Sequence, residues 1–318
     1  MRKTFILIAI SIYTCACNSE TSGECEDLNE LTGIIRANSL YADSLNWRYI
    51  HALKDSVCRN QSPGFTDQFA QLLIKELRKA GDKHSFFIGD SLSKLIDSVS
   101  KQPLVPTGKV IGNNIGYLVL PGFISTYQDH IANYATTLQN LIREIDEQKK
   151  IAGWIIDLRE NHGGNMWPMI AGLGPILGNG LAGYFEVPVN HKRYEWNYTD
   201  GRFGSVVVTD FYQVKHPEKP VALLIGNRTS SSGEMTVVAF LGKPNVKSFG
   251  MPTGGFITAN SHFKLTGGSV LVLANAYVAD RQGRRYIDSV QPDIKIDFEA
   301  DSRVDVAVDS AIKWIQSR

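Results

Sequence analysis

The chain has 318 residues, of which 43% are hydrophobic and 20% are charged. Its 33 Lys and Arg residues nearly balance its 32 Asp and Glu residues, so the formal net charge is +1. This composition is typical of a folded globular protein and excludes disordered, fibrous and coiled-coil chains. The near-neutral charge argues against a nucleic-acid binder, because such proteins usually present a basic face. At this length we expect one large domain and a small accessory one.

Residues 1–16 have the organisation of a secretory signal peptide. Arg2 and Lys3 precede an apolar run that is too short to span a membrane, and small residues lead up to Cys17. A Cys directly after a short apolar run and a small residue resembles the lipobox of bacterial lipoproteins, which would make Cys17 the lipidated new N-terminus. Thr14 stands where this box usually has Leu, so simple secretion is the alternative.

The N-terminus therefore predicts an exported, membrane-anchored lipoprotein of the bacterial cell envelope. No later run approaches the roughly 18 apolar residues of a membrane span, so the lipid anchor is the only membrane contact that we expect. Residues 17–37 are polar without a clear period and are predicted to be a tether. In an exported protein Cys25 and Cys58 either pair or remain two unrelated thiols. No Cys or His cluster has metal-ligand spacing, and we expect neither a metal nor an organic cofactor.

Residues 38–101 are predicted to form a small N-terminal helical subdomain. Apolar residues recur at helical spacing over residues 40–53 and 65–77, and a weaker helical pattern covers residues 91–100.

Residues 102–318 have the pattern of an α/β domain. We predict strands at 115–120, 152–158 and 220–225, three short strands within 246–279, and helices at 128–148, 166–177, 235–241 and 303–316. Nearly continuous apolar strands separated by helices indicate a sheet that is covered on both faces.

Two turns after buried strands carry residues suited to chemistry. Three serines at 230–232 and Glu234 open a predicted helix. Serines at such a place commonly cap the helix. The same helix terminus also offers backbone N–H groups beside a nucleophilic oxygen, as acyl transfer requires. In the other turn, Gly163 and Gly164 form a pair that lets backbone amides approach a ligand closely.

Four motifs follow one another along the chain. They are Asp-Leu-Arg-x-Asn-x-Gly-Gly at 157–164, Thr-Ser-Ser-Ser-Gly-Glu at 229–234, Gly-Met-Pro-Thr-Gly-Gly at 250–255 and Gln-Pro-Asp at 291–293. In this order and approximate spacing they resemble the C-terminal processing (tail-specific) serine proteases, whose relatives include the tricorn core protease and the interphotoreceptor retinoid-binding protein repeats. The resemblance covers about residues 82–298. It implies a ClpP/crotonase-like α/β core, a β-sheet with covering helices, that acts on a peptide or an unfolded protein.

The resemblance implies that Ser231, the middle serine, is the nucleophile. On chemistry alone its neighbours Ser230 and Ser232 stay open. The resemblance further implies an oxyanion hole made by the backbone N–H of Ser232 and that of Gly163 or Gly164, donors that do not depend on side chains.

The general base departs from the commonest pattern of this family. Many members use a Lys directly after the Gly-x-Pro-Thr-x-Gly motif, where this chain has Phe256, so a Ser–Lys dyad at that site is excluded. The tricorn-like branch uses a His from a segment before the core, and Asp-Lys-His-Ser at 82–85 is similar to that segment. The resemblance therefore implies that His84 is the base. A neutral imidazole can take the serine proton at neutral pH and return it to the leaving amine.

The residue that would orient the imidazole of His84 matches the pattern of this branch less well. In the tricorn-like branch a Ser just before the His and a Glu near the terminal Pro-Asp complete the site. Here Lys83 stands at the Ser position, and residues 280–288 contain no Glu. Asp288 is the first candidate for this role, Asp280 is the second, and Ser85 is a further one.

We therefore expect a serine endopeptidase that hydrolyses peptide bonds through an acyl-enzyme. The alternative is a catalytically weakened or inactive module that binds a ligand or peptide on the same fold. An esterase or a crotonase-like acyl enzyme is disfavoured, because no Gly-x-Ser-x-Gly elbow and no CoA-specific signal occurs.

His162, in the Gly-Gly motif, is either a substrate contact or second base, or an exposed turn residue. Residues 85–113 are too few for the PDZ domain that many relatives carry, so substrate selection is expected in the core cleft or in a partner.

Overall fold

The computed structural model describes residues 22–60, 64–99, 102–148, 150–266, 268–297 and 305–318. The α-helices are α1 (Ser22–Asn38), α2 (Trp47–Arg59), α3 (Phe65–Lys79), α4 (Asp90–Val99), α5 (Gln128–Gln148), α6 (Met166–Leu177), α7 (Ser232–Phe240) and α8 (Val306–Gln316). The strands are β1 (Phe86–Ile88), β2 (Thr107–Ile111), β3 (Ile115–Val119), β4 (Gly153–Asp157), β5 (Gly180–Val187), β6 (Lys192–Thr199), β7 (Arg202–Phe203), β8 (Val206–Val207), β9 (Val221–Ile225), β10 (Val246–Gly250), β11 (Ala259–Lys264), β12 (Val270–Asp280), β13 (Arg285–Tyr286) and β14 (Ile294–Lys295). No helix in these ranges is long and apolar enough to cross a membrane.

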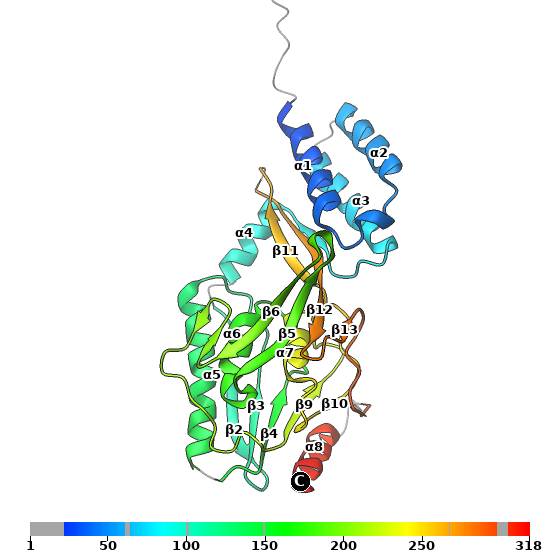
Figure 1. The fold of residues 1–318 in the computed structure, drawn as a ribbon. Coiled ribbons are helices and arrows are strands. Elements are labelled where there is room, and N and C mark those ends of the chain that lie inside the picture. The colour runs from blue at the N-terminus through cyan, green and yellow to red at the C-terminus, as the bar shows by residue number, and fades with distance from the viewer. Residues whose placement is uncertain (1–21, 61–63, 100–101, 149, 267, 298–304) are drawn as a thin grey trace, which may run out of the picture.

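Helices α1 to α3 form a helical unit at the top of the molecule in Figure 1. Leu28, Leu31 and Ile35 lie on one face of α1 at helical spacing and are fully buried in the core of this unit. The prediction that 17–37 is a tether is therefore wrong from residue 22 onward, because this apolar stripe packs the segment against the other helices. The predicted signal peptide and Cys17 lie outside the described residues.

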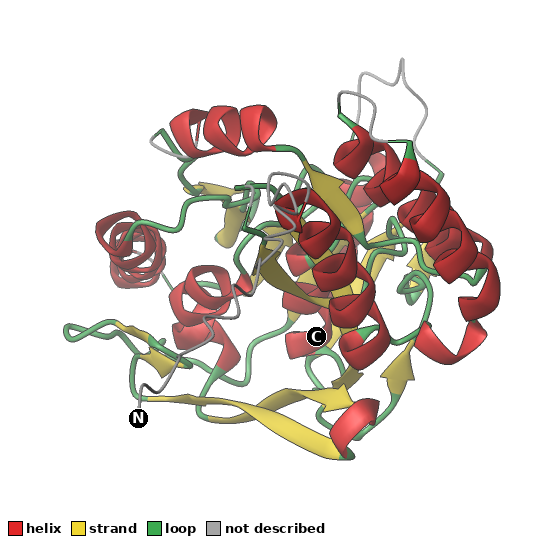
Figure 2. Ribbon diagram, turned by 90° about the horizontal axis from the view of Figure 1, so that it is seen from above, coloured by secondary structure: helices red, strands yellow, loops and turns green. Residues whose placement is uncertain are grey.

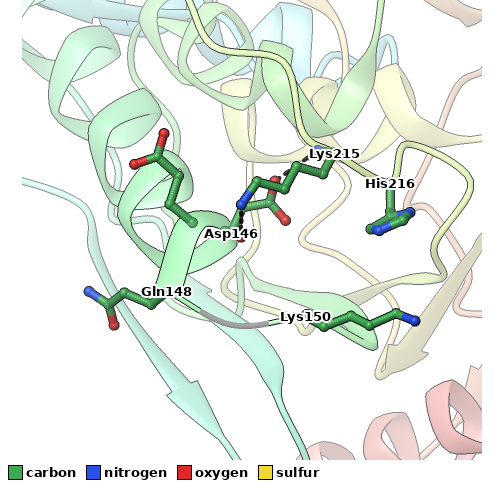
Figure 3. A pocket seen from close by; sticks show the side chains of 6 residues that line it. Asp146, Gln148, Lys150, Lys215 and His216 are labelled. Atoms are coloured by element: carbon green, nitrogen blue, oxygen red, sulfur yellow. Dashed lines mark hydrogen bonds between the residues drawn. The ribbon is translucent and has the colours of Figure 1, made fainter.

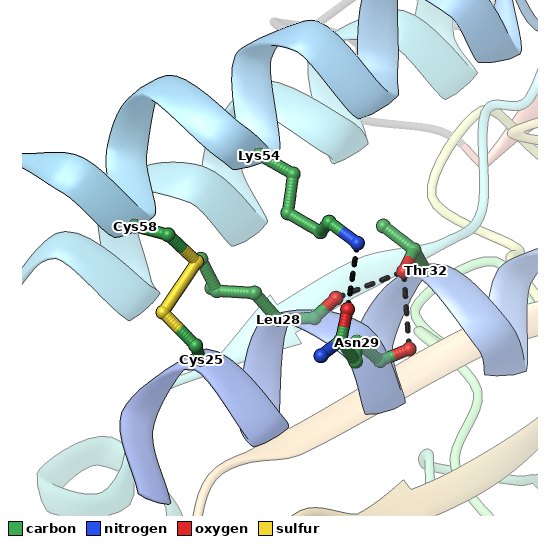
Figure 4. Close-up of a disulfide and its surroundings, with 6 residues drawn as sticks. All are labelled: Cys25, Leu28, Asn29, Thr32, Lys54 and Cys58. Carbon is green, nitrogen blue, oxygen red and sulfur yellow. Dashed lines mark hydrogen bonds between the residues drawn. A yellow bond between two sulfur atoms is a disulfide. The ribbon is translucent and has the colours of Figure 1, made fainter. Parts of the chain in front are cut away.

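A disulfide joins α1 to α2 between Cys25 and Cys58 (Figure 4). Their Cα atoms are 5.9 Å apart and 33 positions apart in the sequence. On the same pair of helices Lys54 Nζ donates to Asn29 Oδ1 at 2.6 Å. The pairing that the sequence left open is thus confirmed. Closing a loop of this length restricts the unfolded chain and stabilises the folded one by about 4 kcal/mol.

The large domain is built on a six-stranded sheet in the order β14-β10-β9-β4-β3-β2, in which only β2 runs antiparallel to its neighbour. Ile156 and Leu223 point to the face covered by α5, α6 and α7. Ile155 and Ala222 point to the other face, which is covered by α8. Figure 2 shows helices on both sides of the strands. The predicted α/β class and the sheet with covering helices are confirmed, and the alternation of side chains in fully buried strands is the reason.

A second, antiparallel sheet connects the two regions through the long strand β12. The first half of β12 pairs with β1 and β11, and its second half pairs with β5 and β13. Leu271 and Leu273 of β12 and Phe87 of β1 belong to the buried core of the helical unit. The predicted boundary at residue 101 therefore does not separate two packing units, because strands from both sides of it share one core.

Candidate active site

Several turns gather at the carboxyl edge of the six-stranded sheet. Because β3, β4, β9 and β10 are parallel, the turns that follow them lie at the same edge, which is the usual ligand site of such sheets. A β-bridge pairs Phe123, after β3, with Gly164, after β4. Ser230, after β9, donates its N–H to the carbonyl oxygen of Asn161 at 3.0 Å. These contacts hold the glycine-rich turn and the serine turn together.

The three serines after β9 have different surroundings. Ser230 Oγ donates to the carbonyl of Arg228 at 3.2 Å, and the buried Ser232 Oγ donates to the carbonyl of Gly164 at 2.6 Å. Ser231 lies between them, partly exposed at the N-terminus of α7, with φ 53° and ψ −119°. This backbone conformation is strained for a residue with a side chain and persists only where its surroundings enforce it. Ser231 is therefore the serine best placed to act as a nucleophile.

The glycine pair approaches the serine turn closely. Gly163 and Gly164 have φ of 96° and 113°, and a Cβ on Gly163 would lie 2.8 Å from the Cβ of Ser231. Gly163 donates its N–H to Asn161 Oδ1 at 3.0 Å. Of the three predicted oxyanion donors, Gly163 is thus engaged within its own turn. Within the described residues no hydrogen bond engages the N–H of Gly164 or of Ser232.

Asn161 is a structural residue of this site to which the sequence pattern assigns no role. Its side chain is fully buried, and its Nδ2 donates to the carbonyl of Leu120 at 3.2 Å. Its Oδ1 accepts the N–H of Gly163, and its backbone carbonyl accepts the N–H of Ser230. Asn161 therefore connects three turns. Its place two residues before a Gly pair was the available signal, since Asn side chains often accept a backbone N–H two residues on.

His84 lies between α3 and β1, and its ring is held by Thr258. Its Nδ1 is 2.8 Å from the carbonyl oxygen of Thr258. Because a carbonyl oxygen only accepts, Nδ1 carries the ring proton, and Nε2 of the neutral imidazole is the free acceptor. The ring of Phe256 meets the imidazole edge-on, with centroids 5.8 Å apart. Burial lowers the pKa of His84 to about 4, so the imidazole is neutral at physiological pH.

The backbone around His84 is held by a buried carboxylate. Asp82 Oδ1 accepts the N–H of His84 at 2.8 Å and that of Ser85 at 2.9 Å. Asn260 Nδ2 donates to the carbonyl of His84 at 3.2 Å. In the sequence Asp82 stands out only as part of the motif at 82–85, although an Asp two residues before a turn residue commonly accepts such bonds. Thr258 and Asn260 carried no signal in the sequence.

The loop that follows β10 links Ser231 and His84 indirectly. No hydrogen bond connects the two side chains in the described part of the chain. Phe256, which touches the imidazole, donates its N–H to Glu234 Oε2 at 2.8 Å, and the same oxygen accepts the N–H of Ser231 at 2.9 Å. Catalytic hydrogen bonds are often long before substrate binds, so this geometry is compatible with a Ser–His pair.

Asp288 does not orient the imidazole of His84 in this structure, although it was the first candidate for this role. Its carboxylate is 71% exposed, and its Oδ1 accepts from Lys83 Nζ at 2.7 Å. The physical reason is that the carbonyl of Thr258 already occupies Nδ1 of His84, the position that an orienting carboxylate would need.

The two further candidates for this role are also engaged elsewhere. Asp280 is buried and accepts from the hydroxyl of Tyr286 at 2.9 Å. Ser85 Oγ donates to Asp82 and accepts the N–H of Ala274, so it joins the loop before β1 to β12.

His162 agrees with the interpretation as an exposed turn residue. Its side chain is 57% exposed, and its Nε2 lies 3.9 Å from Glu160 Oε2. The same carboxylate oxygen is 3.2 Å from Arg228 Nη1, also at the surface. These three side chains form a polar rim beside the glycine-rich turn.

A pocket of about 260 Å³ lies away from these turns (Figure 3). It is lined by Asp146, Glu147, Gln148, Lys150, Lys215 and His216. It lies at the C-terminal end of α5, shortly before the start of β4, whereas the serine and glycine turns follow the C-terminal ends of β9 and β4. Among the described residues no group of three or more His, Cys, Asp or Glu could hold a metal ion.

The chain is similar to known proteins in sequence and in fold. A nisin-resistance protein of Lactococcus lactis subsp. lactis is 30% identical over 287 residues, which cover 88% of this chain and 83% of that protein. A lipoprotein from Streptococcus agalactiae has a similar structure, with a TM-score of 0.76 and 24% identity, covering 97% of this chain and 100% of that one. The photosystem II D1 C-terminal processing protease shares the fold, with a TM-score of 0.59 and 13% identity over 90% of this chain and 96% of its own. The family model of peptidase family S41 matches residues 114–296, more than half of the chain and all of the glycine-rich and serine turns, so the chain belongs to peptidase family S41.

Proposed function

We propose that this protein is a serine endopeptidase of the tricorn-like branch, with Ser231 as nucleophile and His84 as general base. The observation that carries the proposal is the 2.8 Å contact between Nδ1 of His84 and the carbonyl oxygen of Thr258, which leaves Nε2 to accept a proton. Membership of a peptidase family and the strained backbone of Ser231 support the same reading.

The proposed reaction uses groups of this chain alone. His84 Nε2 takes the proton of Ser231 Oγ as that oxygen attacks the carbonyl carbon of the scissile peptide bond. The N–H groups of Gly164 and Ser232 stabilise the resulting oxyanion, because a positive helix end and free amides face the developing charge. His84 then protonates the leaving amine, and water releases the acyl group by the reverse sequence. The carbonyl of Thr258 keeps the imidazole oriented through both steps.

We further propose that the protein acts at the cell envelope, anchored through Cys17. The lipobox-like segment before Cys17 and the likeness to a lipoprotein from Streptococcus agalactiae support this location. A peptide substrate is supported by the peptidase family and by the relative that is named for nisin resistance. Residues 85–113 contribute β1, α4 and β2, which supports substrate selection in the core cleft instead of in a PDZ groove.

A fluorophosphonate probe tests the assignment of the nucleophile. The probe is expected to label the full-length protein at Ser231 and to leave Ser231→Ala unlabelled. Ser230→Ala is the matched control, because it removes a neighbouring hydroxyl from the same turn and should keep the labelling. Equal labelling of the wild type and of Ser231→Ala would reject the proposal.

The second candidate is a weakened or inactive module that binds peptides. One observation favours it: His84 has a neutral carbonyl in place of a carboxylate partner, while Asp288 pairs with Lys83. Hydrolysis of an unfolded protein by the wild type, lost in His84→Ala, would exclude this candidate. Peptide binding in a calorimeter without any cleavage would support it.

A further inference from the structure

Glu234 is a buried carboxylate outside the proposed pair of Ser231 and His84. Its side chain is fully buried at the start of α7, and its two oxygens accept four hydrogen bonds. Oε1 accepts from Thr253 Oγ1 and from the N–H of Gly255, and Oε2 accepts from the N–H of Ser231 and of Phe256. The hydroxyl of Thr253 itself accepts the N–H of Val290. Burial raises the pKa of Glu234, and these hydrogen bonds oppose that shift.

A helix cap alone does not account for these contacts. In a capping box the acidic side chain of the first helical turn reaches back to one N–H, which here is that of Ser231. The other three donors belong to residues 253–256, in the turn after β10, outside the helix. A single side chain therefore fixes the strained backbone of Ser231 and a separate loop at the same time.

That loop also sets the position of the imidazole. Phe256, whose N–H is held by Glu234, packs its ring edge-on against His84 with centroids 5.8 Å apart. Two residues later Thr258 accepts the Nδ1–H of His84 at 2.8 Å. A displacement of the loop would thus move the imidazole relative to Ser231.

We propose that Glu234 is the positioning residue that aligns Ser231 with His84, by holding the serine turn and the loop at 253–258 on one carboxylate. This inference rests on the proposed function of the two residues. Glu234 acts through its neighbours and touches no substrate. Burying a carboxylate is costly unless every lone pair finds a donor, and here the four donors offset that cost.

The variant Glu234→Gln tests the inference with the full-length protein. The amide has the same shape, but its nitrogen cannot accept, so two donors lose their partner. We expect the rate of fluorophosphonate labelling at Ser231 to fall on the order of 100-fold, because misplacement of a reacting group by about 1 Å has that effect. Unfolding curves show whether the variant is folded, and the rate is compared per folded molecule.

A pair of variants at Thr253 covers the case in which Glu234→Gln does not fold. Thr253→Val removes one of the four donors and keeps the shape, whereas Thr253→Ser keeps the hydroxyl. We expect slower labelling in Thr253→Val and a near wild-type rate in Thr253→Ser. Equal rates in the two variants would overturn the inference.

A second readout separates this inference from the proposed function. The pKa of His84 is measured by NMR with isotope-labelled histidine, and His84→Gln assigns its signal. The charged groups that face or border the imidazole, Asp82, Arg78 and the Lys83–Asp288 pair, are unchanged in the variants. Loosening the loop hydrates the imidazole, so its pKa should rise from about 4 towards 6.5 in Glu234→Gln and in Thr253→Val.

The two failures are distinguishable. A wild type that the probe does not label rejects the proposed function, and the titration of His84 still decides on Glu234. An unchanged pKa of His84 in Glu234→Gln and in Thr253→Val overturns the inference about Glu234, even where Ser231 is labelled.

Discussion

The two halves of the site are held in different ways. Ser231 sits in a turn of the α/β core, between the buried Asn161 and the buried Glu234, close to the Gly163 backbone. His84 lies on a loop that leaves the helical unit and is held by Asp82 on one side and by a backbone carbonyl on the other. The nucleophile is therefore positioned within one packing unit, whereas the base depends on contact between two.

This difference has a consequence for motion. Local opening requires less free energy where few buried contacts must break. The serine turn follows the fully buried strand β9, while the loop of His84 is tied to the core through Thr258, through Asn260 of β11 and through Ala274 of β12. We expect the base half to be the first part of the site to lose its geometry under stress, and the following predictions break or sharpen that contrast.

Removing the base should have the largest effect. His84→Gln is expected to lower kcat roughly 1000-fold, because a positioned general base contributes about that factor. The melting temperature should change little, since the core does not depend on this side chain. His162→Gln is the matched control, with an exposed imidazole near the same site. Steady-state kinetics on an unfolded protein substrate measure both variants, and an equal loss in the two would contradict the assignment.

Removing the disulfide should affect the helical unit more than the core. Replacing Cys25 and Cys58 by Ser is expected to destabilise the helical unit by about 4 kcal/mol, because the unfolded chain regains the entropy of the open loop. Hydrogen exchange should accelerate in α1 and α2 and stay slow in β4 and β9. Cys58→Ser alone is the control and should match the double variant. Equal acceleration in all four elements would mean that the two regions unfold as one.

The pH dependence should reveal the buried state of the base. Burial lowers the pKa of His84 from 6.5 to about 4, so more acid is needed to protonate it. The plateau of kcat/KM should therefore extend down towards pH 4 instead of falling below pH 6.5. By linkage, the neutral imidazole stabilises the fold above pH 6.5, and this contribution is lost as the pH falls through about 4. A midpoint near pH 6.5 in the free enzyme would contradict the buried position.

The exposed ion pair between Lys83 and Asp288 should matter least. Lys83→Met and Asp288→Asn are each expected to change the free energy of unfolding by less than about 1 kcal/mol and kcat by less than about twofold, since exposed pairs contribute little. The two variants are controls for each other. A large loss of kcat in Asp288→Asn alone would restore Asp288 as the residue that orients His84.

Periodic segments of the core were predicted from the sequence with few errors. The helices at 128–148 and 166–177 have the predicted bounds, and the strands at 115–120, 152–158 and 220–225 differ by one or two residues. These segments carry strong apolar patterns, which depend on near neighbours along the chain.

Weakly patterned segments were the ones missed. The sequence of α1 is mostly polar, and its apolar residues form only one narrow stripe along the helix. This stripe is buried by α3 and β12, a contact that the sequence of α1 alone does not indicate. The hairpin of β5 and β6 was also missed, since its aromatic and charged residues lack a clean alternation. The interpretation of His162 as an exposed turn residue agrees with the exposure of its side chain.

By itself the sequence determined the fold class and the element order, because helix starts, glycine pairs and buried strands leave local patterns. Ser231 was distinguished from its neighbours only by the resemblance to the tail-specific proteases. The same resemblance indicated His84 through a short motif. Only the tertiary structure decided what holds His84, since Thr258 lies 174 positions away and contributes mainly its backbone carbonyl. Every residue has such a carbonyl, so no side-chain pattern distinguishes the one that accepts the proton of Nδ1. For the same reason Asp288 looked suitable in the sequence, although in the folded chain it faces Lys83 and solvent.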